Sequence, residues 1–364
     1  MKEPASSSKL PTLREIASAC GYGLATVSYA LRENSRIPPA TRDEIRTIAQ
    51  QLGWKPNPLA SAYMAHFRQT RPQSYQANLA FFVDNPESGK ISDQLGHTRL
   101  HYHGIYEHAK QLGYGVEVFW LHEPKLTSRR LASILRNRNI QGIFLPGRDD
   151  GQHIVKYLEW DNFTAISMGV LATNAMFHRI TVDVFGGFHL VFQKLRALGY
   201  CKIAVAVSDF YDKQVNHGVY FPASYIRDCW RESCEIKFCN FKTDTLKEIP
   251  HIQNWLSEHR PEVVIGEGVT KRAIREMGWR VPQDIAIVEV DCKAFGQFAG
   301  LDQRHDLHGK IALEFLVGEI VHNKRGIPEN PLMILIPGRW NDGPSAPPAN
   351  LRQTTLKTVS WESE

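Results

Sequence analysis

The fold is decided near the start of the chain by the stretch TLREIASACGYGLATVSYALRENSRIPPATRDEIRTIAQQLGWKPNPLA, from Thr12 to Ala60. Thr12 and Glu15 form a capping-box pattern, and apolar residues then recur at helical spacing. Further apolar stripes predict a second helix at 24–31 and a third at 39–52. Three short amphipathic helices with tight connections are typical of a helix-turn-helix domain. The side chains that these stripes place inward are Leu13, Ile16, Ala17, Cys20, Val27, Leu31, Ile45, Ile48, Ala49 and Leu52.

The segments on either side of this domain have their own composition. Residues 1–11 are polar and contain proline, which predicts a flexible arm. After the helix-turn-helix domain, which we assign to residues 12–56, residues 57–67 can form a short helix with Asn57 as its cap and Pro58 at its first position. A helix of this length is marginal by itself, so a neighbour must stabilise it.

The chain from residue 68 to 341 alternates apolar strand runs with amphipathic helices. This alternation predicts parallel sheets with helices on both faces, and ligands bind such sheets at the carboxyl ends of the strands. The length of this part suits a larger domain made of two lobes. Residues 342–364 are rich in proline and are predicted to form a flexible tail. The predicted strands are Leu79–Val83, Val116–Trp120, Gly142–Leu145, Thr164–Met168, Ile203–Val207, Val263–Gly266 and Ile285–Val290.

The charge of the chain is uneven. The formal net charge is +5, and the first 71 residues hold ten basic against five acidic residues, so the remainder is balanced. A basic excess at one end is expected of a module that binds a polyanion, although a solvated tail fits the charge equally well. The six cysteines form no C-x-x-C pair, and no apolar segment predicts a signal peptide or membrane span. We therefore expect a cytoplasmic protein without a membrane partner.

Four motifs carry a resemblance to a known family. They are T-x-x-x-[IV]-A at 12–17, T-V-S at 26–28, T-R at 41–42 and L-G-[YW]-x-P-N at 52–57. This stretch resembles the DNA-binding domain of LacI-family bacterial transcription regulators. The resemblance implies an N-terminal all-α helix-turn-helix domain and a short hinge helix, followed by a two-lobed α/β core like the periplasmic binding proteins. It also implies a sequence-specific regulator, expected to act as a repressor, whose operator affinity a small ligand modulates from the cleft between the lobes.

The resemblance assigns roles within the DNA-binding domain. In such domains the second helix enters the major groove, and its first residues contact base edges. We expect Leu24, Ala25 and Tyr29 to read bases, with Leu24 and Ala25 against thymine methyl groups. Tyr29 stands where the family usually has arginine, so bidentate recognition of guanine is not available there. Residues expected to hold phosphates are Thr12, Thr26, Ser28, Asn34, Thr41 and Arg42, although the Ser28 hydroxyl also fits a role in packing.

The resemblance places a hinge helix in the minor groove. In the family an apolar side chain wedges between base pairs there and kinks the duplex, which is usually the work of leucine. This chain has Tyr63 at that position, followed by Met64, and we include Asn57 and Leu59 in the same contact. The hinge should fold only when two copies pair on DNA.

The resemblance to the core is looser. Asp291 matches a pocket carboxylate, Glu267 falls where the family usually has asparagine, and Gln303 matches a polar position in the cleft. The arginine of sugar-binding members would fall near Pro222, in a segment without arginine, so a sugar effector cannot be carried over. Phe221 offers an aromatic surface there for an apolar ligand. The identity of the effector stays open.

Enzymatic motifs are missing from the sequence: it has no nucleophile elbow, P-loop, G-x-G-x-x-G or H-E-x-x-H. We expect no catalytic residues, cofactor or metal. His97 and His101 are spaced to hold a metal on one helix face, but no carboxylate or cysteine completes the set, which favours a solvated or dimer-facing surface.

The expected partners follow from the DNA-binding assignment. One short recognition helix gives weak contact, whereas a two-fold dimer doubles the half-sites on a palindrome, so we expect a homodimer on palindromic double-stranded operator DNA in the bacterial nucleoid. The alternative is a ligand-sensing or solute-binding-like protein with a degenerate DNA-binding domain.

Overall fold

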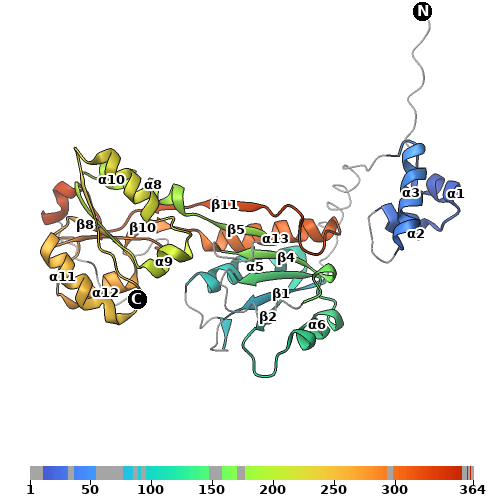
Figure 1. Ribbon diagram of the computed structural model, residues 1–364, viewed down its shortest axis with the longest axis horizontal. Helices are drawn as coiled ribbons and strands as arrows, with labels where there is room; N and C mark the ends of the chain where they lie inside the picture. The colour runs from blue at the N-terminus through green and yellow to red at the C-terminus, as the bar shows by residue number, and fades with distance from the viewer. Residues whose placement is uncertain are drawn as a thin grey trace, which may run out of the picture.

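The computed structural model describes residues 11–31, 37–54, 77–84, 89–91, 96–146, 158–169, 177–292, 298–354, 359 and 361. They form a three-helix bundle and an α/β core of two lobes (Figure 1). The bundle confirms the three predicted helices, which are α1 (Leu13–Cys20), α2 (Leu24–Leu31) and α3 (Pro39–Gln51).

The N-terminal lobe is a parallel sheet of six strands in the order β11-β5-β4-β3-β1-β2. Alternate residues of its strands face opposite helix layers. In β1, Leu79 and Phe81 pack with helices α5 and α13, whereas Ala80 and Phe82 pack with α6 on the other face. The elements of this lobe are β1 (Ala77–Val83), α5 (His97–Leu112), β2 (Tyr114–Trp120), α6 (Ser128–Asn137), β3 (Gly142–Pro146), η2 (Trp160–Asn162), β4 (Thr164–Met168), β5 (His178–Asp183), α13 (His305–Val321) and β11 (Met333–Pro337).

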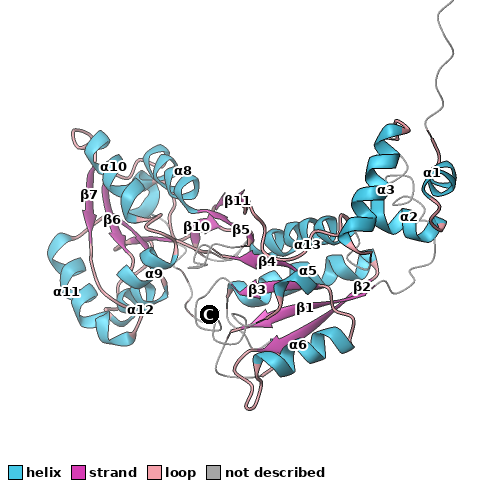
Figure 2. Ribbon diagram, turned by 45° about the vertical axis from the view of Figure 1, so that its right-hand side comes forward, coloured by secondary structure: helices cyan, strands magenta, loops and turns pink. Residues whose placement is uncertain are grey.

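The C-terminal lobe is a second six-stranded sheet, ordered β12-β10-β9-β8-β6-β7, in which only β12 runs antiparallel to its neighbour. Helices α8 and α10 cover one face and α11 and α12 cover the other (Figure 2). The elements are α8 (Val184–Ala197), β6 (Lys202–Ala206), α9 (Asp209–Gln214), α10 (Tyr220–Trp230), β7 (Glu235–Phe238), η3 (Leu246–Glu248), α11 (Ile249–His259), β8 (Val263–Gly266), α12 (Gly268–Glu276), β9 (Ala286–Glu289), β10 (Ala299–Asp302), β12 (Arg339–Asn341) and η4 (Ala349–Thr354).

Three connections between the lobes lie within the described residues. Strand β5 leads directly into α8, β10 leads into α13 through Gln303 and Arg304, and β11 leads into β12 through Gly338. Since β5 and β10 both leave their sheets at the carboxyl end and enter the other lobe, the carboxyl ends of the two sheets face the region between the lobes. Parallel sheets bind their ligands at this end.

The last part of the chain corrects the predicted tail. Residues 342–354 pack onto the C-terminal lobe, and the Ser345 side chain is fully buried. Its hydroxyl donates to the Ile287 carbonyl (2.6 Å) and accepts from the Ala299 amide (2.8 Å). Tyr200 donates its hydroxyl to the Pro347 carbonyl at 2.6 Å. The prolines of this segment indicated flexibility, but proline also fixes φ and suits an irregular segment whose other backbone groups are bonded.

Candidate nucleic-acid interface and ligand-contacting residues

Helix α1 begins with the predicted capping box. The Thr12 hydroxyl accepts from the Glu15 amide at 3.3 Å, and the Glu15 carboxylate accepts from the Thr12 amide at 2.5 Å. Gly21 ends the helix with a φ of 72°, in the left-handed region that glycine adopts without strain. Local sequence therefore fixes both ends of this helix and sets the turn that leads into α2.

The bundle has a small core made by all three helices. The fully buried side chains are Ile16, Val27, Ala30, Ile45 and Ala49. Leu52, which we placed inward, is exposed because α3 ends at Gln51 and Trp54 packs against the core from the segment beyond. Tyr22, in the turn between α1 and α2, donates its hydroxyl to Glu44 on α3 at 2.9 Å.

The predicted base readers lie on the outside of α2. Leu24 is 45% exposed and Tyr29 is 42% exposed, although both are large side chains with an apolar surface. Ala25 is exposed beside them, whereas Val27 on the same helix is fully buried. Monomeric surfaces tolerate single exposed apolar residues, but together these three present one face of a short helix to solvent.

The predicted phosphate contacts surround this face only in part. Thr26, Ser28, Thr41 and Arg42 are half-buried, and Thr12 is exposed with its hydroxyl engaged in the capping box. Asn34 and all four hinge residues, Asn57, Leu59, Tyr63 and Met64, lie outside the described residues.

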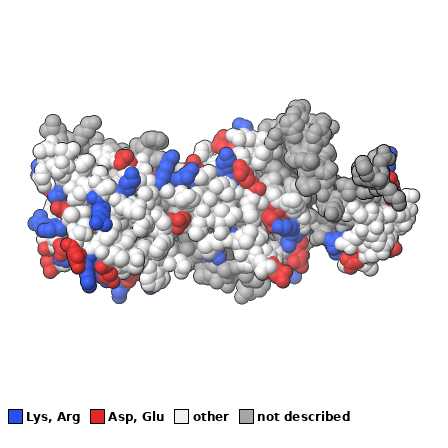
Figure 3. Space-filling model, turned by 90° about the horizontal axis from the view of Figure 1, so that it is seen from above, with Lys and Arg blue, Asp and Glu red and all other residues white. Residues whose placement is uncertain are grey.

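The described bundle carries no excess charge. Its charged side chains are the cations Arg14, Arg42 and Arg46 and the anions Glu15, Asp43 and Glu44. The basic excess of the N-terminal 71 residues thus belongs to the segments flanking the described helices. Basic and acidic side chains of the core are also interspersed over the face drawn in Figure 3.

The core brings three predicted ligand contacts to the carboxyl ends of neighbouring strands. Glu267 directly follows β8, and its carboxylate accepts from the Ser208 amide after β6 at 2.8 Å. Burial raises the pKa of Glu267 above its ordinary value. Gln303 follows β10 and is 4% exposed. Its side-chain amide donates to the Tyr211 hydroxyl (3.0 Å) and to the Val290 carbonyl (2.9 Å).

Tyr211 joins these residues into one group. Burial raises the pKa of its hydroxyl, and the charges of Asp291 and Glu267 act in the same direction. Asp291, which follows β9, accepts a hydrogen bond at Oδ2 from His305 Nε2 at 2.9 Å. The group offers two carboxylates, an amide and a phenol, which together can bind several hydroxyl or amine groups of a small molecule.

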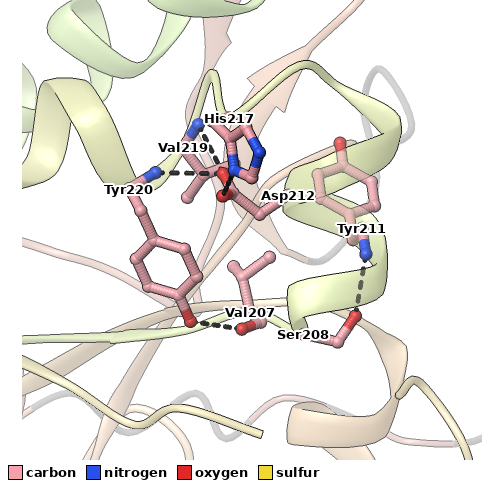
Figure 4. Close-up of polar contacts among 7 residues, drawn as sticks. All are labelled: Val207, Ser208, Tyr211, Asp212, His217, Val219 and Tyr220. Atoms are coloured by element: carbon pink, nitrogen blue, oxygen red, sulfur yellow. Dashed lines mark hydrogen bonds and ion pairs between the residues drawn. The ribbon is translucent and has the colours of Figure 1, made fainter. Parts of the chain in front are cut away.

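Phe221 does not join this group, contrary to our expectation. Its side chain is 70% exposed, with its ring against His217. The neighbouring Tyr220 points inward instead, and its hydroxyl donates to the Val207 carbonyl at the end of β6 (Figure 4). Asp212 fixes this turn, because its carboxylate accepts from the amides of Val219 (3.0 Å) and Tyr220 (3.1 Å). The first turn of α10 therefore places Tyr220, and not Phe221, beside Glu267.

Comparison with known proteins bears on both parts of the chain. Residues 12–57 match the model of the family described as bacterial regulatory proteins, lacI family. The chain is 23% identical over 303 residues to the NTD biosynthesis operon regulator NtdR of Bacillus subtilis (strain 168), an alignment that covers 78% of this chain and 83% of that regulator. The similarity to this family is carried by the residues of the three-helix bundle.

Two solved structures align with more than nine-tenths of the chain. The lac repressor dimer bound to operator and the anti-inducer ONPF aligns over 93% of this chain and 99% of its own, with a TM-score of 0.53 and 16% identity. The transcriptional regulator CelR in complex with cellobiose aligns over 92% of this chain and 99% of its own, with a TM-score of 0.52 and 18% identity. The chain therefore shares the fold of these two proteins.

Several residues at the carboxyl ends of the strands were not predicted from the sequence. Tyr211 and Tyr220 were not selected, because an aromatic residue in an amphipathic helix reads as core. Ser208 precedes the first residue of α9, where its hydroxyl accepts from the Tyr211 amide at 3.1 Å, and its position after an apolar strand was the available signal.

A surface depression of about 480 Å³ lies away from the Glu267 group. Its lining includes Lys202 and Glu235, the first residues of β6 and β7, so the depression is at the amino ends of the strands.

Among the helices described, none is both long and apolar enough to cross a membrane.

Proposed function

We propose that this chain is a regulator of the lacI family, which acts on transcription as a homodimer on a palindromic operator, by binding and not by catalysis. The observation that carries the proposal is the match of residues 12–57 to the family, over three helices whose inward residues are buried and whose predicted readers face solvent. A two-fold dimer would present two copies of α2 to successive major-groove segments. Repression is the direction we propose.

The proposed reading of the operator depends on three side chains. Leu24 and Ala25 are suited to thymine methyl groups, and Tyr29 can donate or accept one hydrogen bond through its hydroxyl. A half-site read by these residues would be poorer in guanine contacts than one read by arginine. The segments that flank the described helices supply the basic residues for phosphate contact.

We further propose that a small polar ligand binds between the lobes and changes operator affinity. Glu267, Asp291 and Gln303 would bind its hydroxyl or amine groups, and Tyr211 would orient Gln303. Such a ligand acts only through the difference between its affinities for the DNA-competent and released states, and about 1–3 kcal/mol suffices.

The experiment that tests DNA binding is selection of duplexes from a random library at a stated salt concentration. The full-length chain is compared with a variant that lacks residues 1–66 and keeps the core. We expect the full-length chain to enrich a palindromic motif, and analytical ultracentrifugation to give the mass of a dimer. A chain that enriches no motif, or a truncated variant that binds equally well, would favour a sensor with a degenerate DNA-binding domain.

The effector is tested separately by thermal unfolding of the truncated core with a panel of ligands. The panel contains cellobiose, glucose and small diamines, and the matched variants are Gln303→Ala and Phe221→Ala. A ligand of the Glu267 group should raise the midpoint of wild type and of Phe221→Ala but not of Gln303→Ala. Equal shifts in all three chains would place the ligand elsewhere.

A further inference from the structure

Four histidines and one carboxylate meet where helix α5 packs against the start of helix α13. His97 and His101 come from α5, His305 and His308 come from α13, and Asp291 comes from the end of β9. The distance from the ring centre of His305 to the ring centre of another histidine is 5.0 Å for His101, 5.4 Å for His308 and 5.8 Å for His97. The two pairs are about two hundred residues apart in sequence, so only the pair on α5 could be recognised from local spacing.

The two helices approach closely enough to bring the imidazoles together because glycine lies at both contacts. A side chain at Gly104 would meet the Asp306 carbonyl oxygen at 2.0 Å, and one at Gly309 would meet the His101 carbonyl oxygen at 2.2 Å. The backbones of α5 and α13 are therefore in direct contact beside the histidines.

Three ring nitrogens converge in this group. Ligand atoms of His101, His305 and His308 all lie within 4.8 Å of one another, and His101 Nε2 is 3.2 Å from His305 Nδ1. In a tetrahedral site with metal–nitrogen bonds of about 2.0–2.1 Å, two ligating nitrogens are about 3.3 Å apart. The His101 and His305 nitrogens already have this separation.

In His305 and His308, the ring nitrogen that does not face the group forms a hydrogen bond, as is common in histidines that bind a metal. His305 Nε2 bonds Asp291 Oδ2 at 2.9 Å, which leaves Nδ1 to face the group. His308 has a hydrogen bond with the backbone of Gln303, while its buried Nε2 has no hydrogen-bond partner. Metal-binding histidines commonly donate their second N–H to a carboxylate or a backbone carbonyl in this way.

Two of the rings are buried and the other two lie closer to solvent. His101 and His308 are buried. His97 is exposed at the edge of the group and His305 is half-buried, which gives an ion a path from solvent.

We propose that His101, His305 and His308 bind a divalent transition-metal ion between α5 and α13, with Zn²⁺ the ion that best suits three imidazoles in a tetrahedral site. Asp291 is a positioning residue that orients His305, and water or His97 completes the coordination. His101 changes tautomer as the ion binds, so that its Nε2 lone pair faces the metal and no net proton is lost. The ion would join an N-terminal helix to a histidine that Asp291 of the C-terminal lobe holds in place.

The test is titration of the full-length chain, purified without a polyhistidine tag, with Co²⁺ and then Zn²⁺. We expect one Co²⁺ per chain with the visible absorption of a tetrahedral site, and displacement of the Co²⁺ by Zn²⁺. His101→Asn and His308→Asn should each weaken binding by at least about 100-fold, and Asp291→Asn by about 10- to 100-fold without loss of the tetrahedral spectrum. His103→Asn is the matched control, because His103 is exposed on the same helix and lies outside the group.

Two readouts keep the proposal open to refutation if a buried variant fails to fold. X-ray absorption at the zinc edge of the wild-type complex should show nitrogen ligands at about 2.0–2.1 Å. Zn²⁺ should also raise the thermal midpoint of wild type and of His103→Asn but not of His305→Asn. Absence of stoichiometric binding by wild type, or equal loss in His103→Asn, would overturn the site. Neither readout depends on DNA, so failure here leaves the regulatory function untouched.

Discussion

The three-helix bundle and the two-lobed core encode their binding residues in opposite ways. The predicted base readers lie within six consecutive residues of one helix, Leu24 to Tyr29, on a bundle with five fully buried side chains. The Glu267 group instead gathers residues that follow three different strands, together with Tyr211 from α9. Local periodicity is therefore enough to predict the helix that carries the proposed readers, whereas the Glu267 group forms only after the sheet has formed. The two parts should also fail independently.

A charge in the bundle core gives the largest expected effect. Val27→Asp places a carboxylate in a core of five side chains, and an unpaired buried charge costs several kcal/mol. We expect loss of operator binding and unfolding of the bundle, while the core keeps its thermal transition. Differential scanning calorimetry with operator binding measures both. A parallel loss of the core transition would show that the two parts do not fold independently.

The packed C-terminal segment gives the next largest effect. Ser345→Ala leaves the Ala299 amide and the Ile287 carbonyl oxygen each without one hydrogen-bond partner, which costs about 1–3 kcal/mol. Urea denaturation of the core measures this loss. The matched control is Ser233→Ala, because Ser233 is exposed and its hydroxyl bonds only the Trp230 carbonyl one turn away. Equal stability of the two variants would mean that residues 342–354 contribute little to the lobe.

These two regions show what sequence patterns could and could not predict. All three bundle helices and seven core strands were predicted, because each has a local signal in helical stripes or a bounded apolar run. Five strands were not predicted, namely β5, β7, β10, β11 and β12. Two of them have little strand signal: β7 is a short edge strand with charged Glu235 and Lys237, and β10 contains Gly300 and Asp302. Their pairing depends on neighbouring strands and not on their own composition.

Some residues of the Glu267 group could be predicted from the sequence, and others depend on the three-dimensional structure. Glu267, Asp291 and Gln303 were found through a family resemblance, and the structure brings them together, whereas Phe221 was placed by the same route and faces solvent. One helical position separates Phe221 from Tyr220, and only the capping of α10 by Asp212 decides which ring turns inward. The His101 and His308 contact joins residues 207 positions apart, for which no local pattern exists.

Two substitutions in the bundle, Tyr29→Ala and Arg42→Ala, test base contact and phosphate contact separately. Tyr29→Ala should relax base preference at one position of each half-site, with a loss of about 1–2 kcal/mol on the best operator and little on others. Arg42→Ala should weaken binding to all sequences alike and lower the slope of affinity against salt. Competition binding on a set of single-base operator variants distinguishes the two patterns. A uniform loss for Tyr29→Ala would remove it from the readers.

A smaller effect is expected at the start of α1. Thr12→Ala removes the hydroxyl that accepts from the Glu15 amide, and loss of such a cap costs about 1 kcal/mol. Thermal unfolding of the bundle measures this loss, with Thr47→Ala as the control, because the Thr47 hydroxyl donates to the Asp43 carbonyl within α3. If Thr12 also contacts phosphate, Thr12→Ala weakens operator binding beyond what the lost stability explains.

The smallest expected effect is a pH dependence of the free energy of unfolding of the core, which arises from Glu267. Burial raises the pKa of Glu267, so the folded chain holds this proton more tightly than the unfolded chain does. The resulting stability is fully present below the ordinary carboxyl pKa of 4.5 and is lost as pH rises through the raised pKa of the folded state. Glu267→Gln keeps an acceptor for the Ser208 amide without the charge.

The free energy of unfolding of Glu267→Gln, relative to wild type, should therefore increase as pH rises from 4 and level off once Glu267 is ionised in the folded wild-type core. Urea denaturation of the core at several pH values gives this difference. Glu258→Gln is the control, because the Glu258 side chain is 79% exposed and its charge costs little. A difference that is constant with pH would mean that Glu267 is already solvated in the folded state, and the group it forms with Gln303 and Tyr211 would then be open enough to exchange water with any ligand that enters.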